Sequence, residues 1–370
     1  MKILFFKSNK FMQDDVIETM REMGHNLDTI TYVFQNYDQD EFFAEKLEHR
    51  LKRICYDLVF SLNFYPVISD VCYQTGIPYA SWIYDSPAPT FFRFDRPTNK
   101  IFLFDQSECD KYQKEGYKNI YYLPLASNVE RLEQMLGFLP ENSPEYKYDI
   151  SFLGVLYDKF NLEKQNLTDS LLNLGILKGY AAAQTLFQNL DILTPLIEQS
   201  GFHFDQEKYN YLMQDLLIET TSQERHNLLT LLSEYFQVEL FSTDRTASRK
   251  FPIHFHNPVQ YETEMPFVFR DSRINLNITL RTIKTAIPLR VFDIISCGGF
   301  LITNPQAELL NFFEPEVDFI PYTSAGDLVE KCDYFLKHDE ERFQIIKNAY
   351  QKVKEAHTLK IRLKKLFETL

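Results

Sequence analysis

Short apolar runs alternate with amphipathic stretches through most of the chain, and this alternation constrains the fold more than any other feature. The first run, KILFF at 2–6, precedes a helical pattern at 14–24 that has an acidic first turn and a terminal glycine. Strand and helix patterns then recur at 25–34, 40–54, 56–63, 66–76, 77–87, 100–105, 107–116 and 119–127. Strands that alternate with helices form a parallel sheet covered on both faces. We therefore predict a first α/β unit over roughly residues 1–126.

A second unit of the same kind follows a linker. Residues 140–147, PENSPEYK, are rich in proline and polar side chains, and the apolar strand pattern at 148–154 begins the new unit. The alternating pattern returns at 236–242, 261–272, 273–279, 290–304 and 318–324, and residues 340–370 are helical in pattern. Residues 159–234 are rich in leucine and predict a helical insertion.

The fold class that follows is α/β, with two doubly wound, Rossmann-like domains that face each other across a cleft. We expect an acceptor-side domain at 1–147 and a nucleotide-binding domain at 148–340 that carries the insertion. We expect the helices of 341–370 to pack back across both domains.

Charge and cysteine content exclude several classes of protein. The formal net charge is −13 over 370 residues, which argues against nucleic acid as a partner because phosphate contacts need a basic face. The five cysteines are widely spaced and form no CxxC pair, so we expect reduced thiols in a cytoplasmic protein. Since no apolar run approaches the ~18 residues of a membrane span, we expect no transmembrane segment.

Residues 290–304, RVFDIISCGGFLITN, hold a charged pair at the head of an apolar helix. Thr285 and Pro288 lead into this helix, and its first backbone N–H groups attract anions. The fork of Arg290 suits phosphate oxygens, and Asp293 lies on the same face, where a ribose supplies hydroxyls to a carboxylate. The pattern fits a nucleoside diphosphate. A plain ion pair on a surface helix is the alternative.

Several segments resemble a known family. Residues 273–279, 287–304, 309–336 and 341–366 resemble the C-terminal domain of the CgeB-like spore-maturation glycosyltransferases, a group-1-type branch with the GT-B fold. Residues 59–72, 76–87, 101–106 and 119–126 resemble the acceptor-side domain found with that branch. The resemblance implies a GT-B fold, a nucleotide-sugar donor, no obligatory metal, and sugar transfer to an acceptor in the interdomain cleft.

One position departs from the pattern of that family. Many group-1 transferases carry two glutamates eight positions apart around this loop. Asp293 stands at the second, ribose-binding position, whereas Thr285 stands at the first, which normally contacts the donor sugar. The identity of the sugar and the choice between retention and inversion therefore stay open.

Candidates in the first domain lie toward the carboxyl end of the predicted strand at 77–87. Asp85 suits a general base for an acceptor hydroxyl, and a turn cap before Pro87 is an equal alternative. Trp82 and Tyr84 share one strand face and, with other aromatics, are candidates for an acceptor sugar platform, although core packing explains most such rings. The other aromatics of this cluster are Phe64, Tyr65, Phe91 and Phe92.

The second domain offers further donor-site candidates. Gly154 follows the first strand and permits close approach of a ligand, although a plain turn explains it equally. Lys284 precedes the phosphate loop and is a candidate for neutralising the diphosphate, although an exposed charge on a loop is the commoner explanation. In the resembled family the region of Asn257 to Tyr261 approaches the nucleotide base. The nearby His254 and His256 lack a visible third metal ligand, so we interpret them as part of a loop.

The leading hypothesis is a metal-independent hexosyltransferase that moves a sugar from a UDP-sugar to an acceptor hydroxyl on a saccharide, glycoconjugate or protein. It requires no cofactor beyond the donor substrate. Arg290 neutralises the leaving diphosphate, which is the largest catalytic contribution assigned here. The alternatives are a nucleotide-sugar epimerase or hydrolase on the same fold, and a non-catalytic nucleotide-sugar-binding module.

Overall fold

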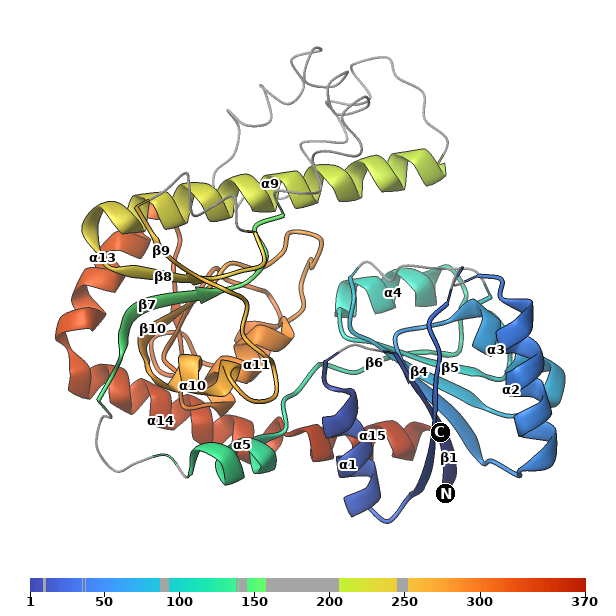
Figure 1. The fold of residues 1–370 in the computed structure, drawn as a ribbon. Coiled ribbons are helices and arrows are strands. Elements are labelled where there is room, and N and C mark those ends of the chain that lie inside the picture. Colours follow the sequence, from blue (N-terminus) through green and yellow to red (C-terminus); the bar gives the residue numbers. More distant parts are fainter. Residues whose placement is uncertain are drawn as a thin grey trace.

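The computed structural model describes residues 1–8, 11–34, 36, 38–86, 93–137, 139, 145–157, 206–244 and 252–370. The chain folds into two lobes, each built on a six-stranded parallel sheet (Figure 1). Of the predicted helical insertion at 159–234, residues 206–234 belong to one long helix, and the remainder lies outside the described residues.

The first lobe contains the strand order β2-β1-β3-β4-β5-β6. The strands are β1 (Lys2–Lys7), β2 (Asn26–Thr31), β3 (Leu58–Leu62), β4 (Tyr79–Ile83), β5 (Asn99–Leu103) and β6 (Ile120–Tyr122). The helices that connect or follow them are α1 (Gln13–Glu22), α2 (Glu41–Arg53), α3 (Pro66–Thr75), α4 (Gln106–Lys114) and α5 (Val129–Leu136). Every residue of β3 and β4 is buried, as expected for central strands covered on both faces.

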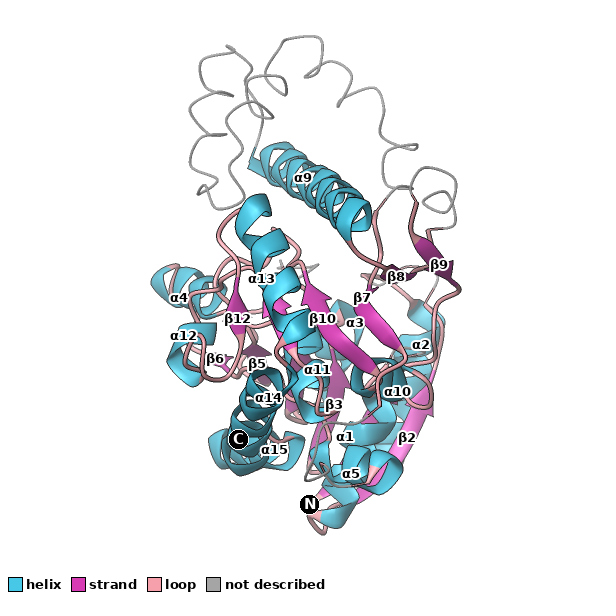
Figure 2. Cartoon of the chain, turned by 90° about the vertical axis from the view of Figure 1, so that its left-hand side faces the viewer, coloured by secondary structure: helices cyan, strands magenta, loops and turns pink. Residues whose placement is uncertain are grey.

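The second lobe contains the order β12-β11-β10-β7-β8-β9. The strands are β7 (Tyr148–Leu153), β8 (Val238–Phe241), β9 (His254–His256), β10 (Ser272–Asn277), β11 (Leu301–Thr303) and β12 (Ile320–Pro321). The helices are α9 (Gln206–Tyr235), α10 (Met265–Arg270), α11 (Leu289–Ser296), α12 (Leu309–Phe312) and α13 (Ala325–Lys337). Helix α13 lies against β10 and α9 (Figure 2).

The last two helices connect the lobes. Helix α14 (Asp339–Ala356) packs on α11, and α15 (Leu359–Thr369) crosses to α1 of the first lobe, where Phe367 stacks on His25 at 4.1 Å (Figure 1). One hydrophobic cluster includes Trp82 of the first lobe, Phe292 of the second and Leu363 of α15. The two lobes therefore share a continuous core in this structure.

Local capping explains where several helices begin. The side chains of Asp40, Asp105, Asn128, Ser324 and Thr358 each accept a backbone N–H in the first turn of the helix that follows. Helix α11 differs, because its N-cap is Pro288 and no side chain caps it. Its first N–H groups are therefore left for other acceptors.

The segment 254–256 differs from the sequence expectation. The sequence suggested a loop, whereas the structure has the edge strand β9, paired in parallel with β8. Three residues are too few to show a two-residue alternation, which is why the pattern was missed. No helix among the described residues is long and apolar enough to cross a membrane.

Candidate active site

The loops at the carboxyl ends of β7, β10 and β11 surround the start of α11. The loop between β10 and α11 also reaches the first lobe. Thr282 donates its hydroxyl to the carbonyl of Ser86 at 2.6 Å, and the backbone N–H of Lys284 donates to Asp105 at 2.9 Å. In doubly wound sheets, this edge is where ligands bind.

Asp293 of α11 is buried, with 2% of its surface exposed. Its Oδ1 accepts a hydrogen bond of 2.7 Å from the hydroxyl of Tyr261. Burial raises the pKa of Asp293 to about 7. The charge of Arg290 and the bond from Tyr261 oppose this rise, and Asp15 of the first lobe adds to it. Asp293 is therefore a carboxyl group that changes charge near neutral pH.

Arg290 lies at the start of the same helix. Its Nη1 donates to the carbonyl of Leu153 at the end of β7, and its guanidinium lies 5.5 Å from the ring centre of Phe269. Its Nε is buried and has no hydrogen-bond partner within the described part of the chain. Burial lowers the pKa of Arg290, which the negative charge of Asp293 opposes. Arg290 and Asp293 thus each have a separate hydrogen-bond partner. Because Asp293 is buried, the two residues do not form the exposed surface ion pair that was the alternative.

Arg225 of α9 is a buried arginine at the same edge, and no sequence pattern pointed to it. Its Nη2 donates to the carbonyl of Ile278 at 2.6 Å, and its Nη1 donates to Val155 at 2.5 Å. The guanidinium therefore ties the end of β7 to the end of β10. Arg225 is buried, whereas Arg290 is half-buried. Burial lowers the pKa of Arg225, and the positive charge of Arg290 lowers it further.

Gly154 follows β7 and lies between Leu153 and Val155, whose carbonyls accept from Arg290 and Arg225 respectively. Its N–H donates to the carbonyl of Phe241 at 3.1 Å. A Cβ atom at Gly154 would lie 3.0 Å from the ring of Phe152 and 3.8 Å from Nη1 of Arg225. The small residue therefore permits the close packing of that ring and the approach of the arginine.

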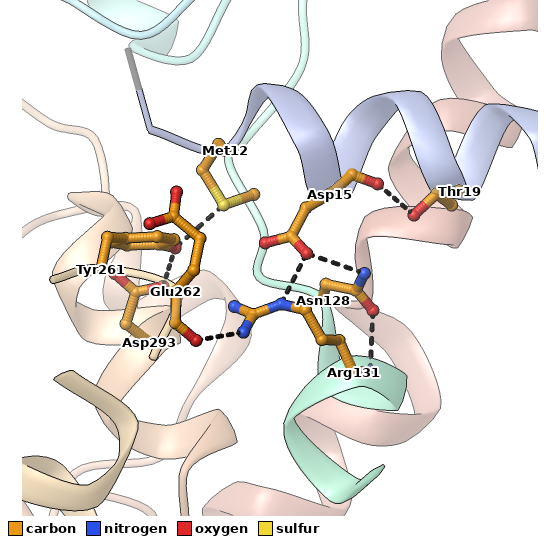
Figure 3. A network of polar contacts seen from close by, with 8 residues as sticks. All are labelled: Met12, Asp15, Thr19, Asn128, Arg131, Tyr261, Glu262 and Asp293. Atoms are coloured by element: carbon orange, nitrogen blue, oxygen red, sulfur yellow. Dashed lines mark hydrogen bonds and ion pairs between the residues drawn. The ribbon is translucent and has the colours of Figure 1, made fainter. Parts of the chain in front are cut away.

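A polar network joins the start of α1 to the second lobe (Figure 3). The hydroxyl of Tyr261 lies 2.9 Å from the sulfur of Met12. Arg131 donates its Nε to Asp15 at 2.6 Å and its Nη1 to the carbonyl of Glu262 at 2.9 Å. These residues come from chain segments more than one hundred positions apart, so no local sequence pattern pointed to them.

Thr285 and Lys284, predicted at the donor site, contact the first lobe. The hydroxyl of Thr285 lies 2.9 Å from Asp105 Oδ1 and 2.7 Å from Glu308 Oε1. Glu308 also accepts from the N–H of Gln106 at 2.8 Å. The side chain of Lys284 is exposed. Thr285 thus lies between two carboxyl groups, one from each lobe.

The first-lobe candidates separate into exposed and buried groups. Asp85 is exposed and accepts from Asn63 Nδ2 at 2.7 Å. Trp82 is fully buried, and its Nε1 donates to the carbonyl of Leu123 at 3.2 Å, so its ring belongs to the core and presents no face to a sugar in this structure. Tyr84 is half-buried, with its ring centre 5.1 Å from that of Trp82.

The remaining aromatic candidates are either buried or outside the described part of the chain. Phe64 and Tyr65 are both 3% exposed and belong to the hydrophobic cluster that also contains Phe6. Phe91 and Phe92 lie outside the described residues.

At β9, Asn257 is exposed, and both neighbouring histidines bond one carboxylate. His254 Nδ1 lies 3.0 Å from Glu239 Oε1, and His256 Nε2 lies 2.5 Å from Oε2. Within the part of the chain that the structure describes, no group of three or more His, Cys, Asp or Glu is arranged to hold a metal ion.

Comparisons with known proteins agree with this architecture. A family model described as glycosyl transferase-like matches residues 223–368, which include Arg225, Arg290 and Asp293. A search of curated proteins finds no match.

Among solved structures, a glycosyltransferase from Rickettsia africae aligns with a TM-score of 0.60 at 10% identity and covers 100% of this chain and 97% of its own. HepE from Anabaena, in complex with UDP and glucose, aligns with a TM-score of 0.58 at 11% identity and covers 100% and 99%. Sucrose-phosphate synthase from Thermosynechococcus elongatus aligns with a TM-score of 0.58 at 9% identity and covers 100% and 98%. The chain therefore has the two-domain α/β fold of the GT-B glycosyltransferases.

Proposed function

We propose that this protein is a nucleotide-sugar glycosyltransferase that takes a UDP-sugar and transfers its hexose to an acceptor hydroxyl. The observation that carries the proposal is the placement of Arg290 and buried Asp293 in the first two turns of α11, whose start no side chain among the described residues caps. Both residues lie within the segment that matches the glycosyl transferase-like family model. The complex of HepE with UDP and glucose supports UDP as the first nucleotide to test.

The proposed donor contacts follow from the chemistry of each group. The first N–H groups of α11 and the guanidinium of Arg290 bind the diphosphate, where their positive charge stabilises the leaving group as the bond to the sugar breaks. Asp293 in its ionised form accepts a hydroxyl proton of the ribose. Tyr261 bonds Asp293 in the structure, so ribose binding uses the other carboxylate oxygen or displaces that hydroxyl.

The proposed reaction forms one bond and breaks one. The acceptor oxygen attacks the anomeric carbon of the donor, the bond from that carbon to the diphosphate oxygen breaks, and the nucleoside diphosphate leaves. The acceptor proton passes to a base, for which Asp85 is the proposed group because it is exposed on the loop that contacts Thr282 through Ser86. The charge of the diphosphate is met by protein groups, so we propose transfer without a metal ion.

The resemblance to the CgeB-like branch and a cytoplasmic location belong to this proposal. Both follow from the sequence segments and the cysteine pattern described above. The acceptor class, whether a saccharide, a glycoconjugate or a protein, is what a transfer assay has to identify.

Calorimetric titration with UDP, GDP, dTDP and CDP tests the donor site directly. We expect wild-type protein to bind one of the four, and Asp293→Ala to bind it at least about tenfold more weakly, the typical effect of losing a hydrogen bond to a charged group. If none of the four nucleotides binds, the phosphate and ribose assignment is wrong. Turnover in a transfer assay with EDTA present tests independence from metal.

The base is tested with variants. Asp85→Asn is expected to abolish transfer but to leave nucleotide binding intact, because the residue is proposed to contact only the acceptor. Asp95→Asn, an exposed aspartate of the same lobe, is the matched control and is expected to retain activity. Full turnover by Asp85→Asn would rule out its role as base.

A further inference from the structure

Asp15 is a buried carboxylate whose two oxygens have different surroundings. The residue lies in the first turn of α1 and is 5% exposed. Its Oδ1 accepts from Arg131 Nε at 2.6 Å and from Asn128 Nδ2 at 3.2 Å. Its Oδ2 is buried and has no hydrogen-bond partner among the described residues. A buried carboxylate oxygen without a donor is costly, so this atom indicates a missing hydrogen-bond donor.

Tyr84 provides a second buried atom of the same kind. Its hydroxyl is buried and has no hydrogen-bond partner among the described residues, and its ring is held edge-on to Trp82. Burial raises the pKa of this hydroxyl well above its usual value, and the carboxylates of Asp15 and Asp293 raise it further. The hydroxyl therefore keeps its proton and is available to donate.

Both residues belong to the region of the proposed ribose site. Tyr84 packs against the same hydrophobic cluster as Tyr261, and the charges of both Asp15 and Asp293 act on its hydroxyl. Met12, which caps α1, contacts the hydroxyl of Tyr261, and that hydroxyl bonds Asp293 (Figure 3). Asp15 reaches the same loop through Arg131, which donates to the carbonyl of Glu262. Asp15 also contributes to the raised pKa of Asp293. Asp15 of the first lobe and Asp293 of the second thus lie in one connected network of polar contacts.

The chemistry of these atoms selects the ligand group. Asp15 Oδ2 needs a donor, and the hydroxyl of Tyr84 needs an acceptor. A phosphate oxygen accepts but is repelled by the carboxylate, and an ammonium group donates but cannot accept. An alcohol hydroxyl both donates and accepts, so it satisfies both atoms at once.

We propose that Asp15 and Tyr84 bind a hydroxyl of the donor's ribose, so that the first lobe closes on the same sugar ring that Asp293 holds from the second. Each hydroxyl of the ribose diol then has its own carboxylate. This inference rests on the proposed function, because it requires a nucleotide at α11. It adds a specificity determinant for ribonucleotides that lies in the opposite lobe.

The test is calorimetric titration of the full chain with UDP, 2′-deoxy-UDP and 3′-deoxy-UDP. The variants are Asp15→Asn, which keeps an oxygen for Arg131, and Tyr84→Phe, which removes one unpartnered hydroxyl. Asp14→Asn controls for the first, since Asp14 is exposed and pairs with Lys7 at 2.6 Å. Tyr121→Phe controls for the second, since Tyr121 stacks on Phe102 in the first sheet. Thermal unfolding confirms that each variant is folded.

We expect Asp15→Asn to weaken UDP binding by about tenfold or more, as loss of a charged hydrogen bond does, and Tyr84→Phe to weaken it by about threefold to tenfold. For the deoxy analogue that lacks the bound hydroxyl, wild type is expected to bind more weakly than it binds UDP, and the two variants are expected to match wild type. If Asp15→Asn does not fold, the comparison with Tyr84→Phe decides the matter, because deleting an unpartnered hydroxyl costs the fold little.

Two outcomes overturn the inference and leave the proposed function standing. In one, UDP binds and Asp293→Ala weakens it, but both variants retain wild-type affinity; the two atoms are then bridged by water alone. In the other, the variants weaken UDP and both deoxy analogues equally, which shows an effect on the lobes unrelated to the ribose. If wild type binds no nucleotide, the proposed function and this inference fail together.

Discussion

The hydroxyl of Tyr261 donates to Asp293 across 2.7 Å and lies 2.9 Å from the sulfur of Met12 in the other lobe. A phenol has one proton, and the carboxylate is the stronger acceptor, so Met12 contacts the hydroxyl as a weaker partner. The hydroxyl of Tyr261 therefore links Asp293, the proposed ribose carboxylate, to Met12 at the start of α1. One side chain thus contacts both the proposed donor site and the other lobe.

Donor affinity is predicted to rise with pH around neutrality. Burial raises the pKa of Asp293 to about 7, and only its ionised form accepts a ribose proton. UDP-glucose is the probe, since its phosphates do not titrate in this range. Between pH 6 and pH 8 the ionised fraction of such a group rises roughly tenfold, and affinity is expected to follow. Isothermal titration over this range checks it.

Asp293→Asn is the control for this pH dependence. The amide does not titrate, so binding to the variant is expected to be weak and flat with pH. A wild-type affinity that stays constant from pH 6 to pH 8 would show that the carboxyl group of Asp293 does not take part in binding in its ionised form.

Thr285 is predicted to stabilise the contact between the lobes. Its single proton serves Asp105 at 2.9 Å or Glu308 at 2.7 Å. Thr285→Val keeps the shape but removes the hydroxyl, so two buried carboxyl groups lose a partner, and we expect a loss of about 1–3 kcal/mol in the free energy of unfolding. Thr285→Ser retains the hydroxyl and is expected to lose less. Urea unfolding measures both.

The cost of Thr285→Val is expected to be larger at pH 8 than at pH 5. Burial raises the pKa of Glu308 above its usual 4.5, and the negative charge of Asp105 adds to the rise, whereas the bonds from Tyr122, Thr285 and Gln106 oppose it. A raised folded-state pKa means that the stabilisation is present below 4.5 and is lost as pH rises through the folded value. At low pH the protonated Glu308 is neutral, so its hydrogen bond from Thr285 is weaker than the bond to the ionised carboxylate at high pH. A loss of stability in Thr285→Val that is the same at pH 5 and pH 8 would contradict this prediction.

Gly299 is predicted to be irreplaceable in the Gly298–Gly299 turn. A Cβ at Gly299 would lie 2.7 Å from Asn275 Nδ2 and 3.0 Å from the backbone carbonyls of Ile294 and Phe269. Gly299→Ala therefore forces backbone apart, and we expect a loss of about 1–3 kcal/mol in stability. Gly326→Ala is the control, because its nearest neighbour, Ser324 Oγ, lies 3.9 Å away. Equal midpoints of denaturant unfolding for the two variants would refute the steric argument.

The strand pattern and the helix boundaries could be predicted because they depend on local chemistry. Asp40 and Asp105 cap predicted helices through the next few residues, and the chain from Pro288 to Gly299 brackets α11. Helix α5, which follows Asn128, was not among the predicted elements. The placement of Asp293 and Arg290 on one short helix followed from their spacing alone. The comparison with the GT-B structures confirms the fold class.

The rest of the candidate site could not be predicted, because its members meet only after folding. Asp15 of α1, Arg131 of α5 and Glu308 before α12 come from separate elements and carry no local signal. Trp82 shows a second limit of prediction, in which the local pattern is clear but does not tell where the side chain lies. Both faces of a doubly covered sheet are buried, so alternation places Trp82 and Tyr84 on one face without telling core from cleft. The structure places the indole in the core.

Arg290 is predicted to bind the diphosphate through the geometry of its guanidinium as well as through its charge. Nη1 donates to the carbonyl of Leu153, and the guanidinium lies over the ring of Phe269. The buried Nε has no partner among the residues that the structure describes. A lysine keeps the charge but lacks the planar fork that matches phosphate oxygens. Arg290→Lys is therefore expected to weaken UDP by about tenfold or more and to leave uridine, which has no phosphate, within about twofold of wild type.

Two further variants separate charge from shape. Arg290→Met removes the charge and is expected to weaken UDP more than Arg290→Lys does. Arg273→Lys is the matched control, since Arg273 lies 3.7 Å from Asp149 at the other end of β10 and is expected to leave both ligands unaffected. Equal losses for UDP and uridine in Arg290→Lys would assign Arg290 to holding the end of β7, through Leu153, and not to phosphate binding. Arg225 holds the same loop through Val155, so in that outcome both arginines would have a structural role. The diphosphate would then be bound by the N–H groups of α11 alone.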